Sequence, residues 1–402
     1  MVPRTRANFT FADLARAAAT SESSDTHRDR LRRLLGDYLG VDDVLLTPSG
    51  RGGLHAILKS IDRPRVIVPA YTCNAVVEAA MLAGKTVEYA DAERDGFNTP
   101  ADSYRDLAGA DAIVIATHQF GIPCEIERTV EICHSKGALV VEDAAASLGT
   151  RRSGRLTGTF GDAAFFSFDI SKLVNVPLKG GAVIAKDAEL LRRIRATYRA
   201  EVAPMPLSVK SRMLAFAGVL AGIQGPRRYR LFHEWRFERS GTFSAESPEL
   251  ELVRSTYYRY DFTEWQAAVA VPQMERIDGL VRARQDTYAE YRRRLEGSRS
   301  FTLPPADRER EWAPIRFPIR VHDDKLAFYR RAVKRGIDFA FSFTFIAAPK
   351  EMRRAHRLAD TVLDLPYYDR LSPGELERTV AVLREIDQAR DTTLESHHGN
   401  QA

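Results

Sequence analysis

Two residues at the ends of apolar segments carry side chains that could do covalent chemistry. Lys172 follows the apolar segment Ala163–Phe168, and Asp143 closes the run Val140–Asp143. A lysine amine can condense with an aldehyde, and a carboxylate can keep a ring nitrogen protonated so that the ring accepts electrons. These are the two protein groups that pyridoxal 5'-phosphate (PLP) needs. The pair therefore predicts a PLP site, with Lys172 as the nucleophile and Asp143 as the partner of the pyridine nitrogen.

A glycine-rich turn near the N-terminus could bind the phosphate of such a cofactor. Gly50, Arg51 and Gly52 lie in the stretch Thr47–Gly53, which opens a helical pattern. Backbone N–H groups at a helix N-terminus, together with the positive end of the helix dipole, favour a phosphate. Glycines also occur in ordinary strand–helix turns, so the turn alone does not establish the site. Arg51 adds a positive charge to it.

The elements around these residues predict an α/β fold. Apolar runs alternate with helical patterns between about residues 45 and 185, which is typical of a mainly parallel sheet covered by helices. Ligands of such sheets bind at the carboxyl ends of the strands, where Asp143 lies. The expected strands are Val66–Pro69, Thr86–Tyr89, Ala112–Ala116, Ala138–Glu142, Ala163–Phe168 and Ala182–Ala185, and the expected helices between them are Leu54–Ser60, Asn74–Ala83 and Glu125–Ser135.

A smaller C-terminal α+β domain is expected after a bridging helix. Thr263 and Gln266 have the spacing of a capping box and open a helical pattern that continues to about Leu295. The small domain would contain a strand at 315–321, a helix at 325–335, a segment at 338–345 and a last helix at 373–389. The expected divisions are an N-terminal segment at 1–40, a large domain at 41–260, the bridging helix and small domain at 261–390, and a polar tail at 391–402 that we expect to be disordered.

The segment 205–245 has two interpretations. It contains the apolar run Met213–Ile223, followed by a mixture of arginine and aromatic residues from Arg227 to Arg239. One interpretation is a helical hairpin on the large domain or at a subunit interface. The other is a surface that contacts lipid, or a lipid-linked or carrier-bound substrate. The sequence leaves both open.

Composition bears on the partners of the protein and on its cellular compartment. The 402 residues carry a formal net charge of +5, which gives no reason to expect nucleic-acid binding. The three cysteines, Cys73, Cys124 and Cys133, lack metal-ligand spacing and predict neither a metal site nor a disulfide framework, in keeping with a reducing cytoplasm. No run reaches the roughly 18 apolar residues of a transmembrane helix. The N-terminus is polar and does not look like a signal peptide.

Taken in order along the chain, the motifs resemble those of the DegT/StrS-type sugar aminotransferases, a branch of the fold-type I PLP enzymes. The resemblance extends from about Asp42 to Ile386, apart from the segment 205–245. The motifs that carry it are Ser49-Gly50-Arg51, Val68-Pro69-Ala70-Tyr71-Thr72, His118-Gln119-Phe120-Gly121-Ile122-Pro123, Glu142-Asp143-Ala144-Ala145, Ser167-Phe168 with Lys172 five residues after the serine, Gly180-Gly181, Thr263-Glu264 with Gln266-Ala267-Ala268, and Leu365-Pro366.

The resemblance implies a role for each candidate residue of the site. Lys172 would be the Schiff-base lysine, and Asp143 would bind the pyridine nitrogen. Ser167 would bind the phosphate. The cradle around that phosphate would be formed by Gly50, Arg51 and Gly52.

The chain departs from the family pattern at five positions. Cys73 stands where the family has a flat side chain over the pyridine ring, and Ala146 stands where a hydrogen-bond donor to the ring oxygen is usual. Lys179 replaces the acidic residue of the Gly-Glu-Gly-Gly turn. Arg51 replaces a threonine of the cradle, and Arg259 replaces the asparagine that a partner subunit often sends to the phosphate. The two arginines could anchor a phosphate, whereas Cys73 and Ala146 leave the ring with fewer partners.

The resemblance implies a PLP-dependent aminotransferase with a ping-pong mechanism. It would move an amino group from an amino acid, glutamate or glutamine, to the keto group of a sugar or cyclitol, nucleotide-linked ones included. A homodimer with shared active sites is also implied, with Arg259 acting in trans. Because of the changes at Cys73 and Ala146, an alternative function is that of a PLP enzyme of the same fold that performs elimination or condensation. A non-catalytic regulatory descendant is a third alternative, and the retention of Lys172 and Asp143 argues against it.

Overall fold

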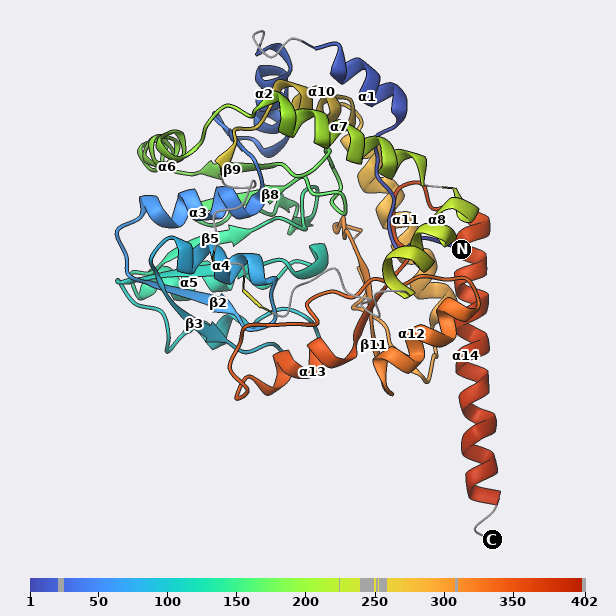
Figure 1. The fold of residues 1–402 in the computed structure, drawn as a ribbon. Coiled ribbons are helices and arrows are strands. Elements are labelled where there is room, and N and C mark those ends of the chain that lie inside the picture. The colour runs from blue at the N-terminus through green and yellow to red at the C-terminus, as the bar shows by residue number, and fades with distance from the viewer. Residues whose placement is uncertain are drawn as a thin grey trace.

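A seven-stranded sheet lies at the centre of the larger domain (Figure 1). The computed structural model describes residues 1–20, 25–223, 225–238, 249–250, 252, 259–307 and 310–399. The strand order is β1-β9-β8-β5-β4-β2-β3. Strands β2, β3, β4, β5 and β8 run parallel, whereas β9 is antiparallel to both of its neighbours. The strands are β1 (Leu45–Thr47), β2 (Arg65–Pro69), β3 (Thr86–Ala90), β4 (Ala112–Thr117), β5 (Leu139–Asp143), β8 (Ala163–Ser167) and β9 (Gly181–Ala185).

The predicted α/β fold class is confirmed, and each of the six predicted strands is present to within one residue at either end. Alternate side chains of the strands are buried on opposite faces of the sheet. Val141 and Phe165 pack on the face that α3, α4 and α6 cover, whereas Val140 packs on the face that α5 covers. Because both faces are covered, polar side chains gather at the carboxyl edge. The covering helices are α3 (Gly50–Ser60), α4 (Asn74–Leu82), α5 (Ile126–Ser135) and α6 (Ala188–Glu201).

The bridge between the two domains consists of two helices, not one. The capping box at its start is present, because the Thr263 hydroxyl accepts from the Gln266 N–H at 3.1 Å and the Thr263 N–H donates to Gln266 Oε1 at 2.9 Å. The expectation of an unbroken helix to Leu295 is wrong. Pro272 has no N–H to donate to the preceding turn, and the first helix ends two residues later. The two helices are α10 (Glu264–Met274) and α11 (Ile277–Leu295), and α2 (Thr26–Leu39) packs against α10.

The smaller domain is built on an antiparallel sheet in the order β10-β11-β12. The predicted strand near 315–321 and the predicted helix at 325–335 are present as β11 and α12. The segment 338–345 contributes only an isolated bridge between Ala340 and Asp364. Helix α14 extends to Gly399, through most of the polar tail for which we expect disorder, and projects from the body in Figure 1. The elements are β10 (Phe301–Thr302), β11 (Phe317–Val321), β12 (Val362–Leu365), α12 (Lys325–Lys334), α13 (Arg353–Thr361) and α14 (Pro373–Gly399).

The segment 205–245 forms helices that contact both domains, as far as it is described. On α7, Met213 and Ala217 pack into the core cluster that includes the N-terminal helix α1. On α8, the Tyr229 hydroxyl donates to Asp338 Oδ2 of the small domain at 2.5 Å. Residues 239–248 lie outside the described part of the chain. The remaining elements are α1 (Phe11–Ala18), α7 (Leu207–Gly222), α8 (Pro226–His233), the short turns η1 (Ala101–Tyr104), η2 (Gln119–Gly121) and η3 (Glu234–Glu238), and the two-stranded pair β6 (Arg151–Arg152) and β7 (Arg155–Leu156).

A transmembrane helix must be both long and apolar enough to cross a bilayer. Within the described ranges, none is both long and apolar enough to cross a membrane. The apolar helix α7 has only 16 residues. A helix of that length spans about 24 Å, short of the roughly 30 Å hydrocarbon core.

Candidate active site

Lys172 lies in the connection between β8 and β9, which its own backbone hydrogen bonds hold in place. The Phe168 N–H donates to the Gly180 carbonyl at 2.7 Å, so the two ends of the connection are tied together. The Lys172 N–H donates to the Asp169 carbonyl at 2.9 Å, and the Asn175 amide donates to the Lys172 carbonyl at 3.1 Å. These contacts fix the lysine just beyond the carboxyl end of β8.

The environment of Lys172 favours a neutral amine. Burial lowers the pKa of Lys172, and the Arg316 guanidinium lowers it further, against the opposing charges of Asp169 and Asp143. A lysine with a lowered pKa presents more free amine near neutral pH, and the free amine is the form that attacks an aldehyde. Cys73 is also close enough to affect this pKa. Asp143 and Cys73 thus both lie near enough to Lys172 to act on its charge.

Asp143 ends β5 with its carboxylate almost fully buried, at 7% exposure. The Ala145 N–H donates to Oδ1 at 3.0 Å, and the Thr117 hydroxyl donates to Oδ2 at 3.4 Å. Burial raises the pKa of Asp143, and the hydrogen bond from Ala145 and the charge of Lys172 oppose that rise only in part. Where little water screens it, an ionised buried carboxylate interacts strongly with a cationic N–H donor. This is the property that a partner for a protonated ring nitrogen requires.

A buried carboxylate next to Asp143 has a structural task that the sequence analysis did not identify. Glu142 accepts from the N–H groups of Gly158, Phe160 and Gly161 at 2.8, 2.6 and 2.6 Å. His118 Nε2 lies 2.9 Å from the same carboxylate. Burial alone would lower the pKa of His118, but Cys124 and Glu142 raise it to about 10. His118 therefore pairs with Glu142, and the pair fixes the ends of β4 and β5 beside Asp143.

The predicted phosphate cradle brings Ser167 to the N-terminus of α3. A Cβ atom added to Gly50 would lie 3.1 Å from the Cβ of Ser167, and one added to Gly181 would lie 2.7 Å from the Gly50 nitrogen. The glycines therefore allow three backbone segments to converge on one small site. The Gly52 N–H donates to the capping hydroxyl of Ser49 at 2.9 Å, so this amide already has an acceptor. The convergence suits an anion at the helix N-terminus.

The residues at the five positions that depart from the family pattern lie in different environments. Arg51 forms an ion pair with Glu78 of α4 at 2.9 Å, and only 16% of its side chain is exposed. Cys73 is the half-buried residue that precedes α4. Lys179 pairs with Asp169 at 3.5 Å, so this loop carries its own acid in place of the missing glutamate. The carbonyl of Ala146 packs closely against Gly121, at 2.6 Å from where a Cβ would be.

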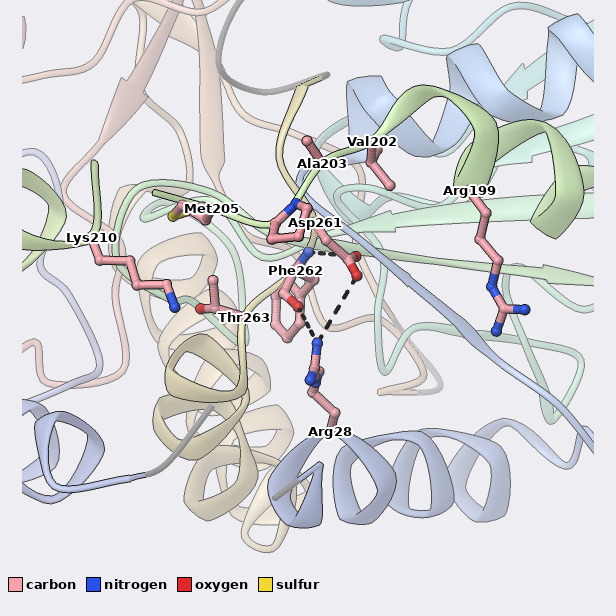
Figure 2. Close-up of a pocket in the computed structure, with 10 residues that line it drawn as sticks. Arg28, Arg199, Val202, Ala203, Met205, Lys210, Asp261, Phe262 and Thr263 are labelled. Carbon is pink, nitrogen blue, oxygen red and sulfur yellow. Dashed lines mark hydrogen bonds and ion pairs between the residues drawn. The ribbon is translucent and has the colours of Figure 1, made fainter. Parts of the chain in front are cut away.

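Arg259, the fifth departure, is exposed, and within the described ranges no contact joins it to Lys172. Its carbonyl accepts from the Ala203 N–H at 2.8 Å, beside a cavity of about 380 Å³. Figure 2 shows that basic side chains from three elements point toward this cavity. None of the candidate residues around Lys172 lines it. The lining residues are Arg28, Arg199, Val202, Ala203, Pro204, Met205, Lys210, Asp261, Phe262 and Thr263.

Comparisons with known proteins agree with this fold. The profile of the DegT/DnrJ/EryC1/StrS aminotransferase family matches residues 11–384. A GDP-perosamine synthase of Vibrio cholerae is 26% identical over 273 residues, which is 67% of this chain and 62% of that relative, less than two thirds of its length. A GDP-perosamine synthase of Escherichia coli O157:H7 is 30% identical over 149 residues, covering 36% of this chain and 41% of that relative.

Solved structures of low sequence identity share the fold. Spr1654 of Streptococcus pneumoniae, in its PMP form, has a TM-score of 0.76 at 18% identity and covers 97% of this chain and 100% of its own. PseC of Helicobacter pylori, an aminotransferase involved in the biosynthesis of pseudoaminic acid, has a TM-score of 0.73 at 16% identity, with 96% and 99% covered. Because the family profile spans nearly the whole sequence, the chain belongs to the DegT/DnrJ/EryC1/StrS aminotransferase family, whose fold is that of the PLP-dependent enzymes of fold type I.

Proposed function

We propose that the protein is a PLP-dependent aminotransferase that moves an amino group from an amino acid, glutamate or glutamine, to the keto group of a sugar or cyclitol. The observation that carries the proposal is the meeting of Lys172 and Asp143 at the carboxyl edge of the sheet. Family membership supports the reaction class. The relatives named as GDP-perosamine synthases support an amino-sugar product and a nucleotide-linked substrate.

The charges around Lys172 and the close approach of backbone segments at Gly50 support a PLP site. When bound, PLP supplies an aldehyde for covalent attachment and a ring that accepts electrons from the substrate. Lys172 would form the covalent bond and then, as a free amine, move a proton at the substrate carbon. Asp143 would hold the proton on the ring nitrogen, and Thr117 and Ala145 orient its carboxylate. Ser167 and the N-terminus of α3 would receive the phosphate.

A screen of amino donors tests this proposal without knowledge of the acceptor. We expect the absorbance of the lysine-bound cofactor to bleach when L-glutamate or L-glutamine is added in stoichiometric excess. The keto acid should appear in the same amount as the bleached cofactor, because the first half-reaction of a ping-pong transaminase leaves the amino group on the enzyme. D-glutamate serves as the matched control. A spectrum that no L-amino acid changes would reject the aminotransferase.

We further propose a homodimer in which Arg259 serves the partner's site. Its exposed position and the neighbouring basic cavity support this arrangement, because cations at a surface suit a phosphate that a second subunit presents. The three cysteines are free, which supports a cytoplasmic location.

Subunit mixing tests the role of Arg259. Arg259→Ala should weaken PLP binding about tenfold, because one charged contact with the phosphate is lost. Mixing this variant with Lys172→Ala should restore up to about a quarter of the wild-type activity, since half of the random dimers then contain one intact site. If Arg259 acts within its own subunit, no mixed dimer has an intact site and no activity returns.

A further inference from the structure

An arginine of the small domain lies at the junction with the catalytic edge of the sheet. Arg316 immediately precedes β11, and the residues before it are hydrogen-bonded to the large domain. The Ala313 N–H donates to the Thr150 hydroxyl, and the Ile315 N–H donates to the Phe120 carbonyl, each at 2.9 Å. Phe120 belongs to the loop that follows β4, next to Asp143. The backbone thus delivers Arg316 to the rim of the Lys172 site.

The guanidinium of Arg316 is only loosely held. Its Nε lies 3.9 Å from Asp364 Oδ2, with 21% of the side chain exposed. Within the described ranges, this is its one ion pair, and no hydrogen bond from the guanidinium is present there. Asp364 also accepts from the Ser342 hydroxyl. Burial raises the pKa of Asp364, and the charge of Arg316 opposes that rise. A structural arginine in a protein interior normally makes several hydrogen bonds, which Arg316 lacks.

The charge of Arg316 acts on the catalytic amine. It lowers the pKa of Lys172, and it is among the cations that lower the pKa of Asp169 against the effect of burial. The groups around Lys172 are then two acids, Asp143 and Asp169, and two cations, Arg316 and Lys179. Lys179 is paired with Asp169 at 3.5 Å. Arg316 is therefore the cation of the site that is best able to accept an anion from the substrate.

We propose that Arg316 binds the α-carboxylate of the amino donor. This inference rests on the proposed aminotransferase function. In an α-amino acid the carboxylate is attached to the carbon that bears the amine, so a cation beside Lys172 lies where that carboxylate must be when the amine reacts. The planar guanidinium offers a carboxylate two parallel N–H donors. The inference limits the donors to amino carboxylic acids.

The loose pairing with Asp364 suits an enzyme that takes two unlike substrates in turn. The keto acceptor of the second half-reaction has no α-carboxylate at the reacting carbon. When it enters, the Arg316 guanidinium would otherwise be left without an anion, and a buried unpaired charge is costly. Asp364, at 3.9 Å, is near enough to neutralise Arg316 during that half-reaction and far enough to release it to the donor.

The decisive comparison uses L-glutamate and 4-aminobutyrate, which is glutamate without its α-carboxylate. In the wild-type holoenzyme, glutamate should bleach the cofactor absorbance much faster than 4-aminobutyrate. Arg316→Gln should lower kcat/KM of the half-reaction for glutamate about 100-fold and leave 4-aminobutyrate within about threefold, because only glutamate loses a charged partner. Arg316→Lys should recover part of the loss, since the charge remains without the bidentate geometry.

Arg320→Gln is the matched control. Arg320 lies on the same strand but donates to the Arg94 carbonyl at 3.1 Å, so its loss should leave glutamate discrimination unchanged. Equal losses for both donors in Arg316→Gln, or no loss for either, would overturn the inference while the aminotransferase stands. If wild-type enzyme reacts with no amino acid, the proposed function itself is wrong, and the inference falls with it.

A measurement on the apoprotein separates these cases further. Arg316→Gln should raise the pKa of the Lys172 amine, because a neighbouring positive charge is removed. The pH dependence of Lys172 reductive methylation, followed by mass spectrometry, reports that pKa without cofactor or turnover. An unchanged pKa would show that Arg316 does not face Lys172, and would reject the carboxylate subsite whatever the donor specificity.

Discussion

Replacing Lys172 with alanine should abolish transamination, with a loss of at least about 10⁴-fold in turnover, because in the proposed site one side chain supplies both the nucleophile and the base. The variant should still bind PLP, since the proposed phosphate site at Ser167 and the N-terminus of α3 does not involve the lysine. It should show the spectrum of free PLP aldehyde in place of the lysine-bound form. Absorbance spectra and single-turnover assays with glutamate measure both effects.

Borohydride trapping gives this prediction a site-specific readout. Reduction of the wild-type holoenzyme should leave the cofactor mass on the peptide that contains Lys172, and reduction of Lys172→Ala should leave it on none. Lys186→Ala is the matched control, because Lys186 follows β9 and donates to the Phe160 carbonyl. A trapped adduct on another lysine, or full turnover in Lys172→Ala, would remove Lys172 from the centre of the site.

Replacing Asp143 with asparagine should lower turnover about 100- to 1,000-fold while the covalent attachment at Lys172 persists. An amide is similar in size and keeps the contacts with Thr117 and Ala145 within reach, but it carries no charge to hold a proton on the ring nitrogen. Burial strengthens the wild-type interaction, so its loss is large. Half-reaction rates with glutamate measure the effect.

A modified cofactor distinguishes this electrostatic role from a structural one. PLP methylated at the ring nitrogen carries a permanent positive charge, so it should recover part of the activity of Asp143→Asn and none of that of Lys172→Ala. The thermal midpoint of the apoprotein should change by only a few degrees. A loss that the methylated cofactor does not relieve, together with a large fall in that midpoint, would mean that Asp143 mainly supports the fold.

The sheet could be predicted because its strands depend on local patterns. Each strand near the site is a short apolar run, and a parallel sheet places the ends of neighbouring strands together. That rule suffices to bring Asp143 toward the lysine that follows β8. The glycines near Ser49 and Gly181 were predictable in the same way, since close approach of backbones leaves no room for a Cβ.

The long-range pairings could not be predicted, because no local pattern encodes them. Glu78 gives no sign that it pairs with Arg51, and Asp169 gives none that it balances Lys179. Arg316 precedes an ordinary strand of the small domain, and its importance comes only from how the two domains meet. The break in the helix after Met274 was not predicted, because the apolar periodicity continues across it. Pro272 was the signal in the sequence that could have located it.

The segment that contains α7 and α8 affects how far the two domains can move relative to each other. The small domain is joined to the large one by α11, and also by α8 through Tyr229 and Asp338. The N-terminal chain adds a third link, because Arg4 Nε donates to the same Asp338 at 2.7 Å. The two contacts that meet at Asp338 restrain rotation of the small domain about α11. We therefore expect substrates to enter by rearrangement of side chains and loops at the rim, with the two domains moving as one rigid unit.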